Sequence, residues 1–133
     1  MKVVIDTNIV VSGLLFGGKP LQILEAVIDG KIEAYTSEVL VEELLRILDE
    51  KFRLPKERLT ETGELIRENF EILNSTTVIK VARDPDDDTV LAVAFEAGAD
   101  YLISGDHDLL VLKRTGTIPI VDSEQFLRLV AYI

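Results

Sequence analysis

Five acidic residues lie at or near positions where a parallel sheet would bring them together: Asp6, Glu43, Asp88, Asp106 and Asp108. Asp6 follows the apolar run 2–5, and two of the other acids follow the run 101–103. Ligands of open α/β sheets bind outside the carboxyl ends of the strands. The spacing of these carboxylates therefore predicts a single acidic site at that edge of the sheet.

Such a cluster favours a bound cation. Two like charges about 4 Å apart repel by roughly 4 kcal/mol at an effective dielectric near 20. Oxygen ligands select hard divalent ions, so Mg²⁺ or Mn²⁺ is the expected cofactor. A divalent ion held by carboxylates with open coordination positions suits phosphodiester hydrolysis.

Strands alternate with helices along the whole chain, which predicts a parallel sheet with helices on both faces. The expected strands span residues 2–5, 32–36, 76–81, 101–103 and 118–121. The expected helices span residues 7–16, 20–28, 39–52, 55–70, 86–97 and 123–131. With 133 residues and no linker or repeat, we expect one domain over residues 1–133.

Two candidate ligands lie within predicted helices. Glu43 borders the apolar stripe of its helix, whereas Glu42 points about 100° away, so Glu43 is the expected ligand. Asp88 lies three and four positions before Leu91 and Ala92, which are expected to face the core. Because Asp88 then shares their face of the helix, it is preferred over Asp87 as a ligand. Asp84 is expected to cap its helix, because acids in a first turn also complement the helix dipole.

The alternative for the other acids is a structural role. Asp6 could simply cap the helix that follows it. The segment 104–108, Ser-Gly-Asp-His-Asp, also has the composition of a polar turn. A lone exposed histidine in a turn more often has no chemical role, so His107 is not assigned one.

Composition excludes several classes of site. The chain has no cysteine and one histidine, which excludes thiolate and His-rich zinc sites. No nucleophile elbow and no phosphate-binding glycine loop is present. The net charge of −10 is unusual for a nucleic-acid binder and suits a basic protein partner. One small basic patch could contact phosphates: Lys51, Arg53, Lys56 and Arg58. With no signal peptide or long apolar run, a cytoplasmic location is expected.

The sequence resembles the PIN-domain family over nearly its whole length. The residues that carry the resemblance are Asp6-Thr7-Asn8, Ser37 with Glu43-Leu44, the acidic run 84–88, and the segment 99–106, Ala-Asp-Tyr-Leu-Ile-Ser-Gly-Asp. It looks most similar to the VapC-like branch, the toxin components of toxin–antitoxin systems.

The resemblance implies an α/β/α sandwich with a five-stranded parallel sheet and a Mg²⁺- or Mn²⁺-dependent ribonuclease. It places the acidic quartet of the family at Asp6, Glu43, Asp88 and Asp106, and an additional acid of some members at Asp108. It also implies an RNA substrate, an antitoxin partner and a homodimer or higher homo-oligomer. Asn8 and Ser104 fall on supporting polar positions, with Ser104 standing where threonine is common.

Two other hypotheses remain open from the sequence. The acidic cluster could belong to a non-catalytic PIN-like module that binds a basic protein or a structural ion, which the net charge favours. A receiver-like phosphoacceptor is less consistent with the chain, because Asp122 stands where a lysine is expected.

Overall fold

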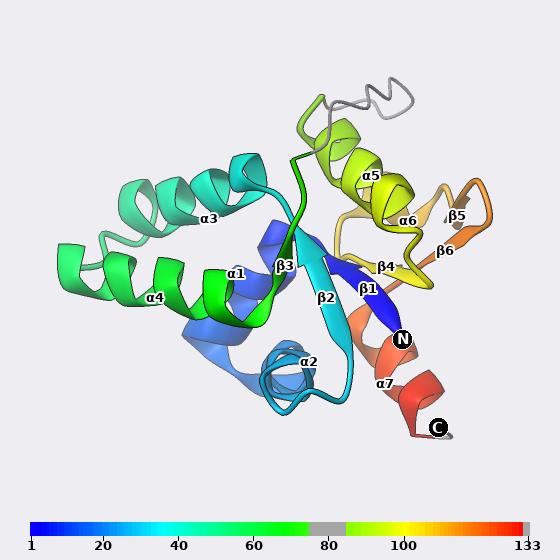
Figure 1. Cartoon of the computed structure of the whole chain (residues 1–133), viewed down its shortest axis with the longest axis horizontal. Coiled ribbons are helices and arrows are strands. Elements are labelled where there is room, and N and C mark those ends of the chain that lie inside the picture. Colours follow the sequence, from blue (N-terminus) through cyan, green and yellow to red (C-terminus); the bar gives the residue numbers. More distant parts are fainter. Residues whose placement is uncertain (75–84, 132–133) are drawn as a thin grey trace.

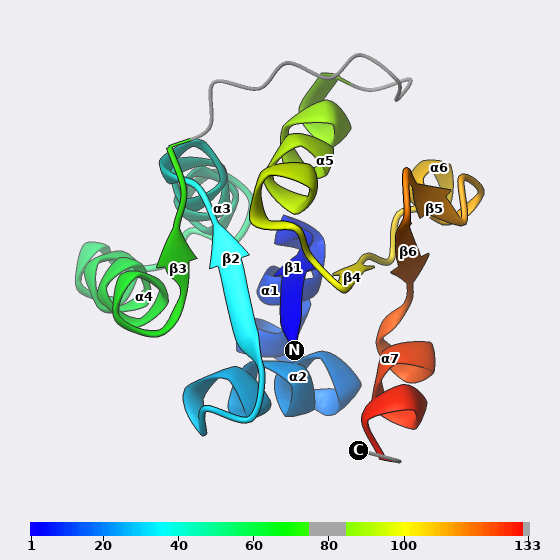
Figure 2. The same cartoon turned by 45° about the vertical axis from the view of Figure 1, so that its right-hand side comes forward.

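The computed structural model describes residues 1–74 and 85–131. A six-stranded sheet runs through the molecule in the order β3-β2-β1-β4-β6-β5 (Figure 2). Its strands are β1 Lys2–Ile5, β2 Glu33–Thr36, β3 Glu71–Ile72, β4 Tyr101–Ile103, β5 Arg114–Thr115 and β6 Ile118–Val121. All neighbours pair in parallel except β5, which is antiparallel to β6. The predicted α/β fold with a central parallel sheet is confirmed.

The strands differ from the prediction at the two edges of the sheet. The edge strand next to β2 is β3, whose Glu71 and Ile72 pair with Tyr35 and Thr36. The strand predicted at residues 76–81 lies outside the described residues. The short β5 was not predicted, because two residues are too few to show the alternation of a strand.

Helices cover both faces of the sheet. The helices are α1 Thr7–Phe16, α2 Gly18–Ile28, α3 Glu38–Glu50, α4 Lys56–Asn69, α5 Pro85–Ala97, α6 His107–Leu110 and α7 Ser123–Val130. One core joins β1 to α1, α2, α3 and α7, and contains Val3 and Ile5. The other core contains Val4 and the buried residues of α5 and α6. Because successive side chains of a strand point to opposite faces, β1 supplies both cores.

Short-range signals explain where several helices begin. Ser37 caps α3, since its side chain accepts a hydrogen bond from the Leu40 N–H. Asp122 and Gln125 form a reciprocal capping box at the start of α7. Both caps hold their helices directly after the carboxyl ends of β2 and β6.

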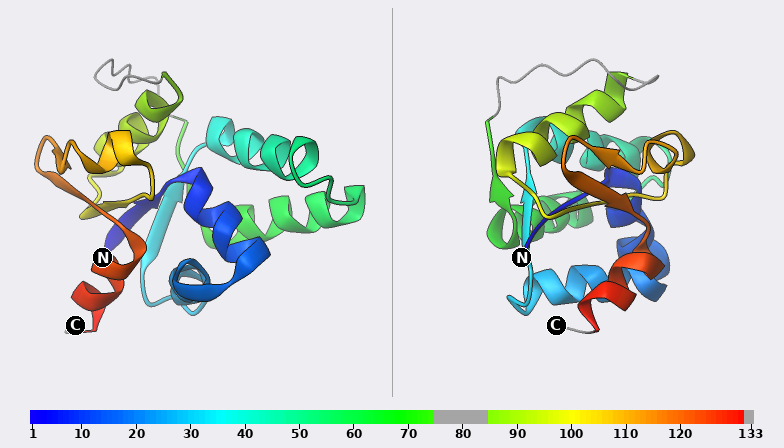
Figure 3. Two further views of the ribbon diagram at one scale, coloured as in Figure 1. Left: turned by 180° about the vertical axis from the view of Figure 1, so that it is seen from behind. Right: turned by 90° about the vertical axis from the view of Figure 1, so that its right-hand side faces the viewer.

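Helices α3 and α4 form an antiparallel pair that extends away from the sheet (Figure 1). Helices α2 and α7 contact each other along the lower edge of the molecule as drawn in Figure 3. No single helix in the described ranges has the length and apolar character to cross a membrane, and only the sharply bent α1–α2 pair would pass on joint length and composition.

Candidate functional site

A buried serine links the ends of two neighbouring strands. The Ser104 hydroxyl donates a hydrogen bond to Oδ2 of Asp6 over 2.7 Å. The same hydroxyl accepts a hydrogen bond from the Asp106 N–H over 3.0 Å. Ser104 is fully buried, and its own N–H donates to the Val121 carbonyl at the end of β6. The carboxyl ends of β1, β4 and β6 therefore meet around one polar centre.

The Asp6 carboxylate is held in an environment that disfavours its charge. Asp6 is only 8% exposed to solvent. Burial raises the pKa of Asp6, the hydrogen bonds from Ser104 and the Thr7 backbone lower it, and the nearby charge of Asp106 raises it again, with a net increase. Burial is the largest of these effects. A cation at this point would offset the cost of keeping the carboxylate ionised.

The capping alternative does not account for Asp6. It occupies the N-cap position of α1, yet its side chain makes no capping hydrogen bond to that described helix. Its backbone N–H instead donates to the Ile103 carbonyl, which fixes Asp6 beside the end of β4. The carboxylate thus accepts hydrogen bonds from Ser104 and from the Thr7 backbone, without making a capping hydrogen bond to α1.

Capping does account for part of the role of Asp106. Its Oδ1 accepts hydrogen bonds from the N–H groups of Asp108 at 2.7 Å and Leu109 at 3.3 Å. These bonds begin the short helix α6, which the sequence interpretation treated as a polar turn. Both bonds engage Oδ1, so Oδ2 of Asp106 takes no part in the cap. Asp106 is close enough to influence the charge of Asp6.

The helical candidates lie on the elements that flank this centre. Glu43 is half-buried on α3 and Glu42 is exposed, which agrees with the predicted orientation of the two side chains. Asp88 is half-buried in the first turn of α5, and α5 contacts β1, β2 and α3. Among the side chains that the structure describes, however, no three Asp, Glu, His or Cys residues are placed to hold a metal ion together.

The remaining candidate residues that the structure describes differ in exposure. Asn8 is exposed in the first turn of α1, and His107 is exposed at the start of α6. Asp108 is half-buried and contributes its backbone N–H to the Asp106 cap. The four residues of the predicted basic patch, at positions 51, 53, 56 and 58, are exposed around the α3–α4 turn. Asp84 and the side chains of Asp86 and Asp87 lie outside the described part.

The donor set agrees with a hard divalent cation in part. Ser104 holds the carboxylate of Asp6, and the α6 cap holds the carboxylate of Asp106. Carboxylate oxygens are the ligands of Mg²⁺ and Mn²⁺. The sequence interpretation gave Ser104 a supporting role only through the family resemblance. Ser104 directly follows β4, and this position at a strand end is the feature of the sequence that indicates its place in the bridge.

Comparison with known proteins identifies a matching family and a relative in sequence. The family model of the PIN domain matches residues 2–108. The uncharacterized protein MJ1680 of Methanocaldococcus jannaschii is 35% identical over 118 residues, which cover 85% of this chain and 76% of that protein.

Two solved structures resemble the fold. A chain in the crystal structure of VapBC2 from Rickettsia felis, bound to a DNA fragment from its promoter, superposes with a TM-score of 0.64. It is 16% identical, and the match covers 92% of this chain and 98% of that one. A chain of VapBC-1 from nontypeable Haemophilus influenzae also gives 0.64, at 15% identity, over 93% and 99% of the two chains. At these identities the likeness concerns the fold.

Proposed function

Because the chain belongs to the PIN-domain family, we propose that it is a divalent-metal-dependent endoribonuclease of the VapC-like type, acting in the cytoplasm. The observation that carries the proposal is the buried bridge from Asp6 through Ser104 to the Asp106 backbone. A carboxylate kept buried, with its pKa raised and no capping role in α1, is expected at a cation site.

In this proposal, Asp6, Asp88 and Asp106 would hold one or two Mg²⁺ or Mn²⁺ ions, with Glu43 binding directly or through water. Asp108 would contribute an additional carboxylate near the same edge. When bound, the ion would lower the pKa of a water molecule for attack on phosphorus and stabilise the charge that develops. Glu43 on α3 and Asp88 on α5 would complete the ligand set.

The protein residues would orient the reacting groups. Ser104 holds the Asp6 carboxylate in one rotamer, because its hydroxyl is fixed in turn by the Asp106 N–H. Asn8, exposed at the start of α1, would contact water or the substrate. Attack by water without participation of the 2′-hydroxyl would leave a 5′-phosphate and a 3′-hydroxyl.

We also propose that the protein works as the toxin of a toxin–antitoxin pair and assembles as a homodimer or higher homo-oligomer. Two observations support an antitoxin partner. The fold matches chains of VapBC2 and VapBC-1, and the net charge of −10 suits association with a basic protein.

The test is cleavage of a panel of end-labelled single-stranded and structured RNAs with Mn²⁺, Mg²⁺ or EDTA. Cleavage should require the metal and should be lost in Asp6→Asn and Asp88→Asn. Asp29→Asn, an exposed carboxylate at the end of α2, is the matched control and should retain activity. Full activity in a purified, folded Asp6→Asn variant would refute the site.

A non-catalytic binding module is the second candidate. It is favoured by the lack of a preformed three-ligand group among the described side chains. Thermal unfolding with Mn²⁺ separates the two candidates when RNA is not cleaved. Stabilisation of the wild type but not of Asp6→Asn would keep the metal site and point to an RNA missing from the panel. The same Mn²⁺-induced shift in both proteins, or none in either, would favour the binding module.

A further inference from the structure

Two exposed phenylalanine rings meet where helices α1 and α3 end. Phe16, the last residue of α1, is 73% exposed, and Phe52, two residues after α3, is 40% exposed. Their ring centroids lie 6.1 Å apart, and the angle between the ring planes is 68°. Single exposed apolar side chains are ordinary on a protein surface, whereas these two rings form one aromatic patch that is open to solvent.

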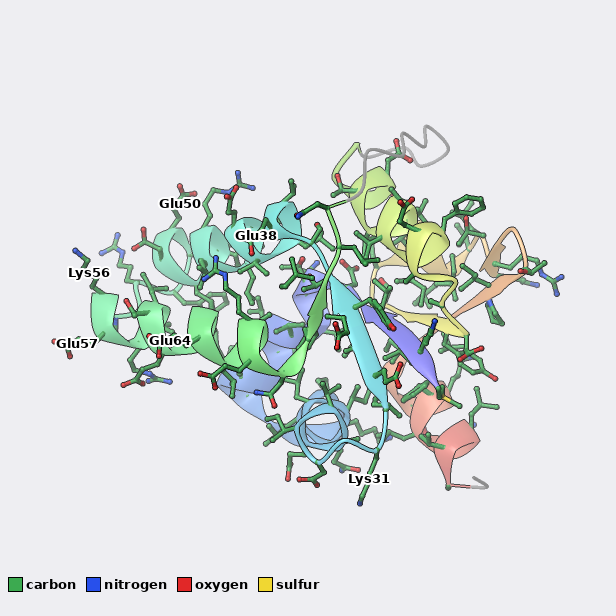
Figure 4. All side chains as sticks on the ribbon, viewed as in Figure 1. Lys31, Glu38, Glu50, Lys56, Glu57 and Glu64 are labelled. Atoms are coloured by element: carbon green, nitrogen blue, oxygen red, sulfur yellow. The ribbon has the colours of Figure 1, made fainter. Side chains whose placement is uncertain are left out.

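The turn between α3 and α4 has a local excess of positive charge. Residues 46–58 contain five cations and three carboxylates, whereas the whole chain contains 14 and 24. The four cations of the turn itself are exposed: Lys51, Arg53, Lys56 and Arg58. Figure 4 shows Lys56 at this turn, near Glu50 at the end of α3. Within the described part of the chain none of the four makes an ion pair, whereas Arg67 is paired with Glu38. Their charges are therefore available to an anionic ligand.

Arg53 has a backbone conformation that glycine usually adopts. Its φ is 51°. Its N–H donates to the Asp49 carbonyl, and the Leu54 N–H donates to the Leu48 carbonyl, the pattern that ends a helix at a left-handed residue. Glycine is the usual residue there, because a side chain is disfavoured in the left-handed region. Stability of the turn therefore does not explain why a charged side chain stands at this position.

Both helices run from the sheet edge to this turn. Helix α1 begins directly after Asp6 and has 10 residues, and α3 begins after Ser37 and has 13. At 1.5 Å of rise per residue these lengths are about 15 Å and 20 Å. Nucleotides of a strand are about 3.4 Å apart along a duplex axis, so this separation corresponds to about four to six nucleotides. One strand of nucleic acid is long enough to reach both places.

We propose that the turn surface, formed by Phe16, Phe52 and the four cations of the turn, binds single-stranded RNA. Bases would stack on the exposed rings and phosphates would meet the cations, which is how proteins bind single strands without reading their sequence. A duplex offers phosphates but no free base for the rings. An anionic membrane fits less well, because a flat surface would also meet the exposed α4 glutamates at positions 57, 61, 64 and 68.

The choice of RNA as ligand rests on the proposed function, and the turn surface adds a binding site away from the acidic residues. Binding there needs neither a metal nor cleavage, so the two proposals can fail separately. A protein that binds RNA in EDTA but never cleaves it would keep the turn surface and refute the nuclease. Metal-dependent cleavage with no binding at the turn would do the reverse.

The test is fluorescence anisotropy in EDTA with a labelled oligouridine of about 12 nucleotides, long enough to span the separation estimated above. An RNA duplex of equal length is the comparison. At about 0.15 M salt, where long-range attraction is screened, the single strand should bind at least about fivefold more tightly than the duplex. A factor of this size corresponds to the stacking of one base on one aromatic ring.

Removal of a ring tests stacking. Phe16→Ala and Phe52→Ala each delete one ring of the pair, and Phe95→Ala is the matched control, since Phe95 is 62% exposed on α5. Each variant of the pair should weaken binding of the single strand at least about fivefold and binding of the duplex by less than about twofold. Phe95→Ala should change neither by more than about twofold.

Neutral substitutions test the phosphate contacts. Lys56→Gln removes one charge from the turn, and Lys31→Gln makes the same change at an exposed lysine between α2 and β2, far from the turn (Figure 4). Lys56→Gln should reduce the slope of the log association constant against log salt by about 0.7, the value for one phosphate of a single strand. Lys31→Gln should leave that slope unchanged.

Arg53→Gly separates binding from stability. Glycine suits a φ of 51°, so the variant should unfold at a higher temperature than the wild type. It should nevertheless bind the single strand more than about twofold less tightly, because a phosphate contact is lost. A purely structural role of Arg53 would lower the midpoint of thermal unfolding and leave the binding unchanged.

Equal affinity for the single strand and the duplex would overturn the proposal, as would unchanged binding in folded Phe16→Ala. Vesicles of phosphatidylserine and phosphatidylcholine that displace the strand, and bind less tightly to Phe16→Ala, would assign the surface to a membrane instead. Dissociation of an oligomer in Phe16→Ala would assign it to a second copy of the chain.

Discussion

Ser104→Ala is the substitution that most directly probes the polar centre. It deletes a hydroxyl that is fully buried and makes two hydrogen bonds, one to Oδ2 of Asp6 and one from the Asp106 N–H. A buried hydrogen bond to a charged group contributes about 1.5–3 kcal/mol, and a donor left unpaired adds a cost of its own. We expect a loss of about 2–4 kcal/mol of unfolding free energy at neutral pH without metal.

The loss should depend on pH in a defined direction. The folded-state pKa of Asp6 is already raised by burial, and the Ser104 hydrogen bond partly offsets this increase. A carboxyl whose pKa is higher in the folded state favours folding when protonated and opposes it when ionised. Loss of the Ser104 hydroxyl raises the pKa of Asp6 further. The loss of unfolding free energy in Ser104→Ala should therefore be small below that pKa and should grow as the pH rises through it.

The assay is urea unfolding in EDTA across a range of pH, together with the double mutant Ser104→Ala, Asp6→Asn. Ser123→Ala is the matched control. Its hydroxyl is also buried and follows a neighbouring strand, but it has no hydrogen-bond partner among the described residues. The control should cost less than about 1 kcal/mol, whereas the double-mutant cycle should give a coupling of about 1.5–3 kcal/mol between Ser104 and Asp6.

The reasoning would be refuted by either of two results. A cost that is the same on both sides of the Asp6 titration would show that the hydroxyl does not support the ionised carboxylate. A coupling near zero would show that the 2.7 Å contact contributes nothing to stability.

Three further outcomes follow from the structure. Gly13→Ala should lower the free energy of unfolding in urea by about 1–3 kcal/mol, because the new Cβ would lie 2.7 Å from Leu24 Cδ1 and 3.0 Å from a backbone carbon of Pro20. A change near zero would mean that α1 and α2 separate easily. Asp122→Ala should cost about 0.5–2 kcal/mol by removing the α7 capping box, and an unchanged midpoint would contradict that role. Asp6→Asn should raise the thermal midpoint of the metal-free protein at neutral pH but not in acid, where the wild-type carboxyl is protonated. An equal rise of the midpoint at neutral and at acid pH would argue against the raised pKa of Asp6.

The parts of the fold that the sequence predicted are those with several turns or a buried apolar run. The helix expected at 39–52 is α3 at Glu38–Glu50, which Ser37 caps. The elements that were missed, β3, β5 and α6, contain two to four residues. Such segments have no measurable periodicity, and their form is determined by pairing with β2 and β6 or by the Asp106 cap.

The site was predictable to a similar extent. Strand ends determine where Asp6 and Ser104 stand, so their approach follows from the order of the sheet. Helical periodicity likewise distinguished half-buried Glu43 from exposed Glu42. Whether Glu43 and Asp88 reach the centre depends on the tilt and spacing of α3 and α5, which no local pattern specifies. Their role as ligands therefore stays a prediction.

The acidity of the chain has two separate physical consequences in this structure. At the sheet edge, burial and the charge of Asp106 make ionised Asp6 unfavourable, so a cation that binds there is linked to folding and should stabilise the native state. On α4 the glutamates at positions 57, 61, 64 and 68 are exposed and repel one another little at physiological salt. A net charge of −10 is thus compatible with the proposed nuclease if a metal neutralises the buried carboxylate and salt screens the exposed ones, so that the substrate is bound locally.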